Sequence, residues 1–371
     1  MIMRYIYQLE EWPNLTWNLS VLAPVLASVR HRQGLLVGQM KAQGFVLREE
    51  ARLINLTSEI VQSSAIEGEK LEAGQVRSSI ARHLGMDIGG ATPTSRHIDG
   101  IVEMMLDATV NYDEPLTTER LFGWHAALFP TGRSGMQNIT VGAWRTGSMQ
   151  VVSGGMGYEK VHYEAPEADQ VSEEMNRFID WFNSAPESDP ILKAALAHFW
   201  FVTIHPFDDG NGRIGRAIAE LALTRADGMP ERFYSMSSQI EAERNDYYKA
   251  LEFCQKGSTD ITRWMKWFIE CLGRTLERAE NTVHLVLKKS RIWEKANAGR
   301  INERQHKVIA RLLDDFKGPL NTSKYAKIAK CSTDTALRDI CGLVGLDLLK
   351  QNPGGGRSTS YSLVEPVSGI H

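Results

Sequence analysis

The sequence has few cysteines, and this scarcity bears on metal and disulfide chemistry. The four that occur among 371 residues are widely spaced and form neither a CxxC pair nor a Cys/His cluster. Such spacing argues against a zinc site and against a disulfide framework. It favours a reducing, cytosolic setting. The four positions are Cys254, Cys271, Cys331 and Cys341.

Long hydrophobic runs are also absent. The longest nearly apolar stretch, Ile191–Ile204, contains Lys193 and His198 and is shorter than the roughly 20 residues that cross a bilayer. Residues 1–13 mix Tyr, Glu and Arg among apolar residues, so they lack the pattern of a secretory signal. We therefore expect a cytoplasmic protein without membrane association, in which Ile191–Ile204 is a buried helix.

The sequence also lacks a large excess of charge of either sign, since its formal net charge is only −3. Residues 300–365 hold 11 Lys and Arg against 7 Asp and Glu, so the rest of the chain carries −7. A basic tail of this kind is compatible with nucleic-acid contact, although so small an excess is more often solvated surface. The chain length fits one large domain and one smaller domain.

Apolar residues at helical spacing predict a mainly α-helical fold. Pro166 and the acidic residues after it mark one helix start, and Pro190 marks the start of the buried helix. Beyond residue 260 an aromatic-rich segment continues into a long charged helix. The other helices predicted for the large domain are 15–43, 46–63, 75–84, 95–110, 117–128 and 171–183.

Two regions have a different texture. Between residues 150 and 165 the stretches VVSGG, MGYEK and VHYEA predict two short strands around a glycine turn. After Gly299, helical patterns at 305–313, 322–329 and 333–343 precede a PGGGRSTS turn and a short strand. Three helices followed by a hairpin are typical of a winged helix-turn-helix domain.

In that arrangement the helix 333–343 would be the recognition helix and residues 354–358 the tip of the wing. The helix offers Thr335 and Arg338 for reading bases, whereas Asp334 and Asp339 oppose the approach of phosphate. The sequence therefore leaves DNA binding open, and protein contact or homodimer formation is at least as well supported.

The most informative stretch is HPFDDGNGRIGR, from His205 to Arg216. Its Gly-Asn-Gly turn allows backbone N–H groups to converge at the start of a helix, which creates an anion-binding nest. Arg213 and Arg216 stand three residues apart and share a face of that helix, where their guanidinium groups suit adjacent phosphates. We expect a phosphate cradle here.

Side chains around the turn add chemistry to this cradle. Asp208 and Asp209 offer carboxylates, one of which could hold Mg²⁺ against the phosphates. His205 ends a rigid buried helix and is placed to take a proton from an incoming hydroxyl. The spacing is neither that of a Walker A loop nor that of GxGxxG.

These residues meet the signature HPFx(D/E)GNGRxxR of the Fic (filamentation induced by cAMP) family at every position, and the chain resembles that family over residues 1 to about 290. The resemblance implies an α-helical fold that transfers AMP from ATP to Ser, Thr or Tyr hydroxyls of target proteins. It implies His205 as general base and Asp209 as Mg²⁺ ligand; Asp208 stands at the variable position. Asn211 and the amides of Gly210 and Gly212 would surround the α-phosphate, with Arg213 and Arg216 on the outer phosphates.

The resemblance also assigns two features near the cradle. The hairpin 150–163, here called the flap, would pair with an extended segment of the target through its exposed edge. Tyr247 and Tyr248 would form the adenine-side wall. A branch of the fold that transfers phosphate departs from Gly-Asn-Gly-Arg in the turn, and this sequence does not, so AMP transfer is favoured.

A further segment resembles the family's inhibitory pattern (S/T)xxxE(G/N). It runs from Ser63 to Gly68 and contains Glu67. Glu67 precedes an apparent helix end at Gly68, where the helix dipole disfavours a carboxylate by roughly 0.3–1 kcal/mol. The resemblance names Arg216 as its partner, which implies a built-in brake on the use of ATP.

We therefore predict a helical leader with the brake over 1–90, a catalytic domain over 91–295 and a winged-helix-like domain over 300–365. The predicted function is a self-inhibited protein adenylyltransferase that uses Mg²⁺-ATP. A deAMPylase or phosphotransferase on the same cradle, an ATP-sensing DNA-binding regulator and a dimeric scaffold stay open as alternatives.

Overall fold

The structure is a computed structural model of the 371-residue chain. It describes residues 5–42, 45–86, 92–153, 160–185, 189–313, 316, 318–353 and 359–364. The chain divides into two compact units, Met1–Ala279 and Glu280–His371, and the division falls within one long helix.

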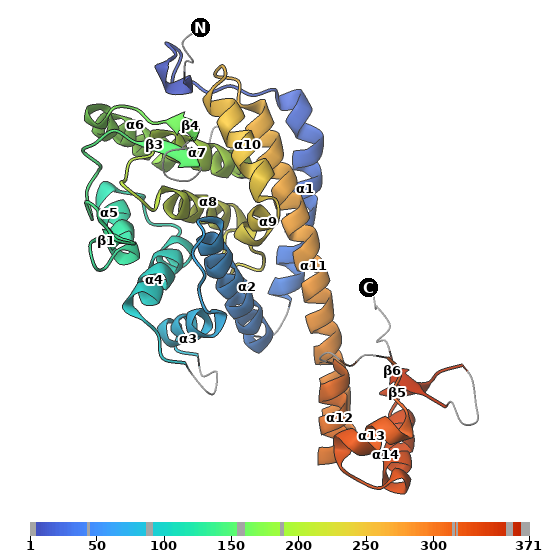
Figure 1. Ribbon diagram of the computed structural model, residues 1–371. Coiled ribbons are helices and arrows are strands. Elements are labelled where there is room, and N and C mark those ends of the chain that lie inside the picture. The colour runs from blue at the N-terminus through green and yellow to red at the C-terminus, as the bar shows by residue number, and fades with distance from the viewer. Residues whose placement is uncertain are drawn as a thin grey trace. The chain divides into compact units, whose positions relative to one another are not determined.

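The first unit is built mainly of helices, with short antiparallel strand pairs (Figure 1). The expectation of a mainly helical fold with small hairpins is confirmed. In chain order the helices are η1 (Ile6–Gln8), α1 (Leu19–Lys41), α2 (Phe45–Ile66), α3 (Ala73–His83), α4 (Arg96–Val110), α5 (Thr118–Leu128), η2 (Ala168–Gln170), α6 (Val171–Asn183), α7 (Pro190–Ile204), α8 (Asn211–Asp227), α9 (Met236–Ala242), α10 (Arg244–Gln255) and α11 (Thr262–Ala298).

Two helix ends differ from the prediction by more than two residues, and the local backbone and its hydrogen bonds explain both. Helix α1 begins at Leu19 rather than residue 15, because the Asn18 side chain accepts the N–H groups of Ser20 and Val21. Helix α2 continues past residue 63 to Ile66, and it ends where Gly68 takes a positive φ of 85°.

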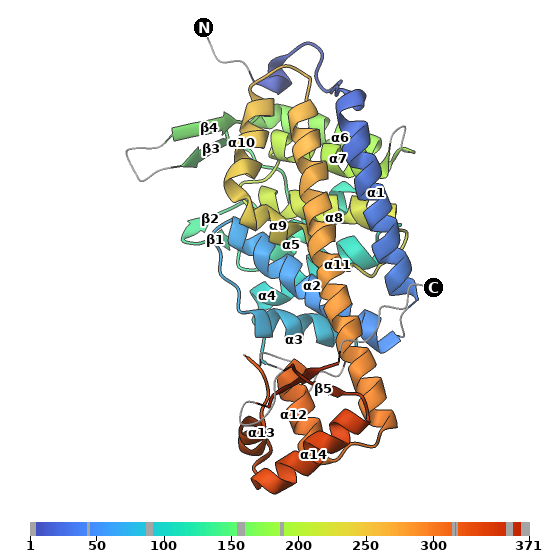
Figure 2. The same cartoon turned by 90° about the vertical axis from the view of Figure 1, so that its right-hand side faces the viewer.

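Helices α7 and α8 form the centre of the first unit (Figures 1 and 2). Every residue of α7 from Ile191 to Ile204 is buried except Lys193, as expected for the apolar run. The two helices approach closely at Gly215, where a Cβ would lie 2.8 Å from a methyl group of Val202. Helices α2, α4 and α5 pack against α8, and α6 packs against α7. The turn from 205 to 210 therefore joins two rigid, buried helices.

Two strand pairs belong to this unit. Strands β1 (Arg133–Ser134) and β2 (Gln137–Asn138) form one pair, and β3 (Gln150–Ser153) and β4 (Lys160–Glu164) form the other. The β3–β4 pair is antiparallel with a register shift between Val151 and Val152. It coincides with the predicted hairpin, whose turn at 154–159 lies outside the described residues.

The second unit has a core of its own, which includes Ile292, Val308, Tyr325 and Ile340. After the end of α11 it consists of α12 (Glu303–Leu313), α13 (Thr322–Ala329), α14 (Thr333–Gly345), β5 (Leu349–Gln351) and β6 (Tyr361–Leu363). The two strands pair antiparallel. The expected wing tip, 354–358, lies outside the described residues. None of the helices described in either unit has both the length and the apolar character needed to cross a membrane.

Candidate active site

The turn between α7 and α8 holds His205 in a defined tautomer. His205 caps α7 in the left-handed region with φ of 53°, and its Nδ1 lies 3.1 Å from the carbonyl oxygen of Val202. Because a carbonyl oxygen can only accept, Nδ1 carries the proton and Nε2 keeps a lone pair. Burial is the main cause that lowers the pKa of His205. The imidazole is therefore neutral at pH 7 and able to accept a proton.

Asn211 closes the turn with both ends of its side-chain amide. Its Oδ1 accepts the N–H of Phe207 at 3.0 Å, and its Nδ2 donates to the Phe207 carbonyl at 2.8 Å. Gly210 has a φ of 81°, and a Cβ there would lie 2.9 Å from the Phe129 ring. The Asn211 side chain thus shapes the turn, and its backbone N–H is the part directed to the helix N-terminus.

The N-terminus of α8 is a site for an anion. Gly210 is its N-cap and supplies no side-chain acceptor, so the first N–H groups of α8 are left for another acceptor. A Cβ on Gly212 would lie 1.9 Å from Oε1 of Glu67. The carboxylate of Glu67 therefore lies directly against this helix end, where only glycine leaves room for it.

Glu67 also forms an ion pair with Arg216. Nη1 of Arg216 lies 2.9 Å from Oε1 of Glu67, Nε donates to the Ser63 hydroxyl at 2.8 Å, and Nη2 donates to the Ser63 carbonyl at 2.7 Å. Arg216 is 2% exposed, and although burial opposes its charge, Glu67 is the leading cause that raises its pKa. The structure brings together Glu67 and Arg216, the pair that the resemblance named, and adds contacts from Ser63, the first residue of the inhibitory pattern.

A second carboxylate holds the other arginine, and the sequence reasoning missed it. Oε2 of Glu69 lies 2.9 Å from Nη1 of Arg213, and Oε1 contacts Nε2 of His97. The hydrogen bond from His97 is the leading cause that lowers the pKa of Glu69. The sequence did contain a signal for this contact, since Glu69 is the second glutamate of Glu-Gly-Glu. The positive φ of Gly68 turns Glu69 toward the N-terminus of α8, where Glu67 also lies.

The family of this site follows from its sequence. The Fic/DOC family model matches residues 115–223, which contain the whole turn and both arginines. Residues 115–223 are a Fic/DOC domain. Residues 5–86 match a second model, described as a domain of unknown function (DUF4172), and the segment from Ser63 to Glu69 lies within it.

Relatives of the chain carry the same family name. The protein adenylyltransferase Fic of Aedes aegypti is 30% identical over 223 residues, which are 59% of this chain and 40% of the relative. That of Nematostella vectensis is 37% identical over 114 residues, or 30% and 25% of the two chains. This chain thus spans less than half the length of the curated relatives it matches.

A solved structure supports the fold. A Fic family protein from Desulfovibrio desulfuricans aligns with a TM-score of 0.53 at 20% identity, covering 92% of this chain and 96% of that protein. This likeness shows that the chain has the Fic fold.

The two aspartates of the Fic turn differ in their contacts. Asp208 accepts the backbone N–H of Thr140 at 2.8 Å and so fastens the loop after β2 to the turn. Asp209 accepts from the Ser134 hydroxyl and from the N–H of Gly210. Within the described residues no three His, Cys, Asp or Glu side chains gather to hold a metal by themselves. Asp209 directly precedes Gly210, the N-cap of α8.

The two tyrosines beside the Fic domain also differ. Tyr247 is 2% exposed and its hydroxyl lies 2.9 Å from Nε2 of His198, in the core. Tyr248 is 36% exposed, and its hydroxyl lies 3.5 Å from the carbonyl of Ile66, close to Glu67. Of this pair, Tyr248 has the ring surface that a ligand can reach.

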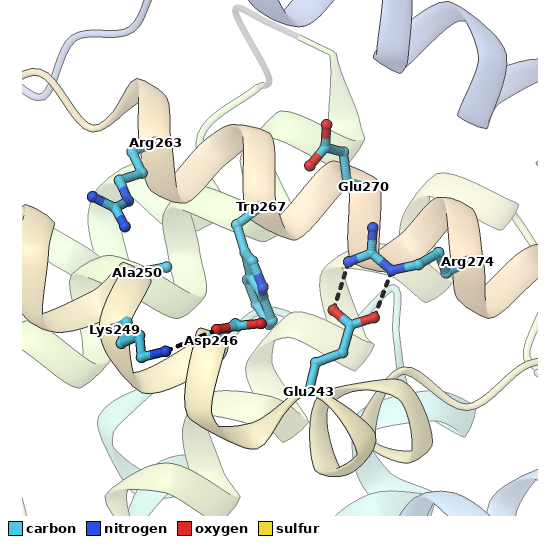
Figure 3. A pocket seen from close by; sticks show the side chains of 8 residues that line it. All are labelled: Glu243, Asp246, Lys249, Ala250, Arg263, Trp267, Glu270 and Arg274. Carbon is cyan, nitrogen blue, oxygen red and sulfur yellow. Dashed lines mark hydrogen bonds and ion pairs between the residues drawn. The ribbon is translucent and has the colours of Figure 1, made fainter.

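A cavity of about 540 Å³ lies between α10 and α11 (Figure 3). Three cationic and three anionic side chains line it. Several of them pair with one another, as Glu243 does with Arg274 at 2.5 Å and Asp246 with Lys249 at 3.3 Å. None of its lining residues belongs to the Fic turn or to the segment around Glu67. Balanced, paired charge gives this cavity no preference for an anion.

Proposed function

We propose that this chain is a protein adenylyltransferase that moves AMP from Mg²⁺-ATP to a Ser, Thr or Tyr hydroxyl of a target protein. The observation that carries the proposal is the neutral His205, with Nε2 available, beside a helix N-terminus whose two arginines are held by carboxylates. Carboxylates on such arginines occupy positions suited to phosphates. The names of the curated relatives support the same activity.

In the proposed reaction the target hydroxyl gives its proton to Nε2 of His205 while its oxygen bonds to the α-phosphorus of ATP. The bond from that phosphorus to the bridging oxygen of the β-phosphate breaks, and pyrophosphate leaves. The amides of Asn211 and Gly212, joined by that of Gly210 once it leaves the Asp209 carboxylate, would stabilise the negative charge that builds on the α-phosphate. Arg213 and Arg216 would hold the outer phosphates.

Mg²⁺ would enter as part of the nucleotide substrate. Mg²⁺ usually binds through one or two carboxylates together with phosphate oxygens and water. The single carboxylate of Asp209, next to the anion site, fits that mode of binding. Asp209 would therefore orient the metal-bound phosphates, with Ser134 holding the carboxylate in place.

The target would bind along the flap as an extended segment. Main-chain hydrogen bonds to a strand edge position a segment largely independently of its side chains. Val152 and Val161 are exposed on the two strands of the flap, at 47% and 40%, and offer apolar contact. Tyr248 would contribute to the adenine wall.

We propose that Glu67 is the brake. While Glu67 pairs with Arg216, that arginine would be unable to bind the outer phosphates of ATP. The Glu67 carboxylate would also occupy space next to Gly212 that the phosphates need. The same geometry supports a second reaction, removal of AMP from a modified target. Among the residues that the structure describes, Oε1 and not Oε2 of Glu67 bonds to Arg216, and the side chain is 33% exposed, so Oε2 would orient a water molecule.

We also propose the domain bounds, the location and the oligomeric state that the sequence predicts. The leader would cover residues 1–90, the catalytic domain 91–295 and the winged-helix-like domain 300–365, in a cytoplasmic protein that forms a homodimer. DNA binding by the last domain would appear as binding to duplex DNA that weakens steeply as salt rises.

Intact-mass analysis after incubation with Mg²⁺-ATP tests the activity. We expect Glu67→Gly to gain AMP adducts by self-modification, the wild type to gain few, and Glu67→Gly/His205→Ala to gain none although it still binds the nucleotide. Adducts on the His205→Ala double variant at the same rate would contradict the proposed base.

A further inference from the structure

Arg145 lies buried between the flap and the turn that carries His205. Its side chain is 2% exposed. Nε donates to the carbonyl of His205 at 2.8 Å, Nη1 donates to the carbonyl of Gly147 at 2.8 Å, and Nη2 donates to the carbonyl of Pro166. Its own backbone N–H donates to the Pro206 carbonyl at 2.9 Å. Arg145 thus ties its own stretch of chain, which includes Gly147, to two others, around His205 and around Pro166.

This position is costly for a cation. All the hydrogen-bond partners described for the guanidinium are backbone carbonyls, and burial lowers the pKa of Arg145. A buried charge destabilises a fold unless polar groups surround it, and an apolar side chain of similar volume often serves stability better. Stability alone therefore gives a weak reason for an arginine here.

The three carbonyls belong to the two ends of the flap and to the proposed proton acceptor. His205 is the proposed proton acceptor, and its backbone is held in the left-handed region at φ of 53°. Gly147 lies just before β3, and Pro166 lies just after β4. Arg145 therefore joins both roots of the flap to the peptide group of His205.

Two other contacts of the flap do not make this connection, and the backbone bond from residue 145 to Pro206, which any non-proline residue at 145 keeps, ties only the first root to the turn. The Tyr163 hydroxyl donates to the carbonyl of Thr203 at 2.7 Å, which ties β4 to the last turn of α7. The N–H of Ala165 donates to the carbonyl of Met149 at 2.9 Å, which ties the two roots to each other. Neither contact reaches the carbonyl of His205.

We propose that Arg145 is a positioning residue that fixes the flap, and hence the target hydroxyl on it, at a set distance from Nε2 of His205. The inference rests on the proposed function of the flap and of His205. Arg145 touches none of the groups that would bind ATP. Its loss should consequently lower the rate of transfer at saturating ATP and leave nucleotide affinity unchanged, because small displacements of reacting groups cost about 100-fold in rate.

The test uses Arg145→Met, Arg145→Lys and a matched control, all with Glu67→Gly. Arg225 is the control, because it also donates to backbone carbonyls, those of Tyr112 at 2.6 Å and Glu114 at 2.8 Å, near the opposite end of α8. Arg225→Met should lower the melting temperature to a similar extent through lost hydrogen bonds. Four quantities are measured: the melting temperature, the rate of self-modification, the affinity for a non-hydrolysable Mg²⁺-ATP analogue and backbone hydrogen exchange.

We expect Arg145→Met to slow self-modification by at least about tenfold with unchanged nucleotide affinity, and to speed exchange in segments 145–153, 160–166 and 205–209. Arg145→Lys should be intermediate, since it keeps the charge but cannot reach three carbonyls. Arg225→Met should leave the rate of self-modification unchanged. Hydrogen exchange in those three segments should also stay as slow as in the parent. An Arg145→Met variant that behaves as Arg225→Met does overturns the inference.

The experiment distinguishes failure of the proposed transfer activity from failure of the proposed role of Arg145. If the Glu67→Gly parent gains no adduct, the proposed transfer activity has failed, and hydrogen exchange alone decides the role of Arg145. Loss of protection in all three segments of Arg145→Met then supports the tie between flap and turn. Unchanged protection in any of the three overturns it.

Discussion

At the residue scale, the site consists of two arginines that are each held by a glutamate. Glu67 and Glu69 follow one another around Gly68 and reach Arg216 and Arg213, respectively. Both arginines are largely buried. Removing Glu67 alone therefore leaves Arg213 engaged, and the nucleotide must still displace Glu69 to reach it.

This arrangement predicts an effect of Glu69→Gln in a Glu67→Gly background. Glutamine keeps the size of the side chain but releases Arg213 from an ion pair whose carboxylate is 31% exposed. The affinity for Mg²⁺-ATP should therefore rise by about three- to fivefold, as expected for an ion pair worth up to about 1 kcal/mol. AMP lacks the outer phosphates, and its affinity should not change. Isothermal titration calorimetry with each nucleotide measures both.

Glu50→Gln is the control for that measurement, because Glu50 is an exposed glutamate of α2, the helix that precedes Glu69 in the chain. It should alter neither affinity. Equal tightening of ATP and AMP by Glu69→Gln would show that the residue acts on the shape of the site and not through Arg213.

The charge of His205 sets the dependence on pH. Its pKa is lowered, mainly by burial and also by Arg145, while Glu67 and Asp209 oppose the shift. A proton acceptor works only when neutral, so the rate of Glu67→Gly should stay level as pH falls through about 6.5, the ordinary pKa of histidine, and drop only below it. A pH–rate profile at saturating ATP with a midpoint above that value would contradict this assignment.

The sequence predicted which residues form the cradle but not all of their contacts. The turn from His205 to Arg216 and the pair Glu67–Arg216 were found from spacing and resemblance. Arg145 gave no signal, since its partners are carbonyls that any sequence supplies. The inward direction of the Asn211 side chain depends on the geometry of the turn, which the residue type alone does not determine.

At the scale of elements, glycines show where helices touch. In α4, a Cβ on Gly100 would lie 1.9 Å from the carbonyl oxygen of Ala127 in α5. In α1, Gly34 is exposed and has nothing within 4 Å of a Cβ. Two substitutions by alanine should therefore have opposite effects on stability.

Gly100→Ala should lower the free energy of unfolding by about 1–3 kcal/mol, because the backbones of α4 and α5 must separate. Gly34→Ala should raise it by about 0.5–1 kcal/mol through helix propensity. Chemical denaturation of both variants measures the difference. A Gly100→Ala protein as stable as the wild type would mean that α4 and α5 do not pack this closely.

Helix positions were accessible to prediction because apolar residues repeat at helical spacing, whereas helix ends depended on single capping residues. Asn18 delayed the start of α1, and the positive φ of Gly68 allowed α2 to run to Ile66. That extension of α2 matters for function, because it carries Glu67 to the start of α8.

At the scale of the whole molecule, the site and the tail belong to different compact units. Every residue assigned to the site lies between Ser63 and Tyr248, within Met1–Ala279. The second unit has its own buried core around Val308 and Ile340. A Glu67→Gly chain that ends at Ala298, the last residue of α11, should thus keep its rate of self-modification within about twofold, a change worth less than 1 kcal/mol.

Quantitative mass spectrometry of the shortened and full chains checks that expectation. A loss greater than about tenfold, near 1.4 kcal/mol, would mean that the second unit contributes to catalysis. The order of helices and strands in the second unit was predictable from the sequence. Its role was not, because Arg338 favours the approach of nucleic acid and Asp334 opposes it, so the sequence indicates no particular binding partner.

The central claim is that the cradle transfers AMP, and the position of the transferred label tests it most directly. Glu67→Gly protein would be incubated with Mg²⁺-ATP labelled with ³²P on either the α- or the γ-phosphate, with His205→Ala/Glu67→Gly as control. The account predicts that protein retains the α label and not the γ label, and that the control retains neither. Retention of the γ label would contradict it, because the reaction would then be phosphate transfer.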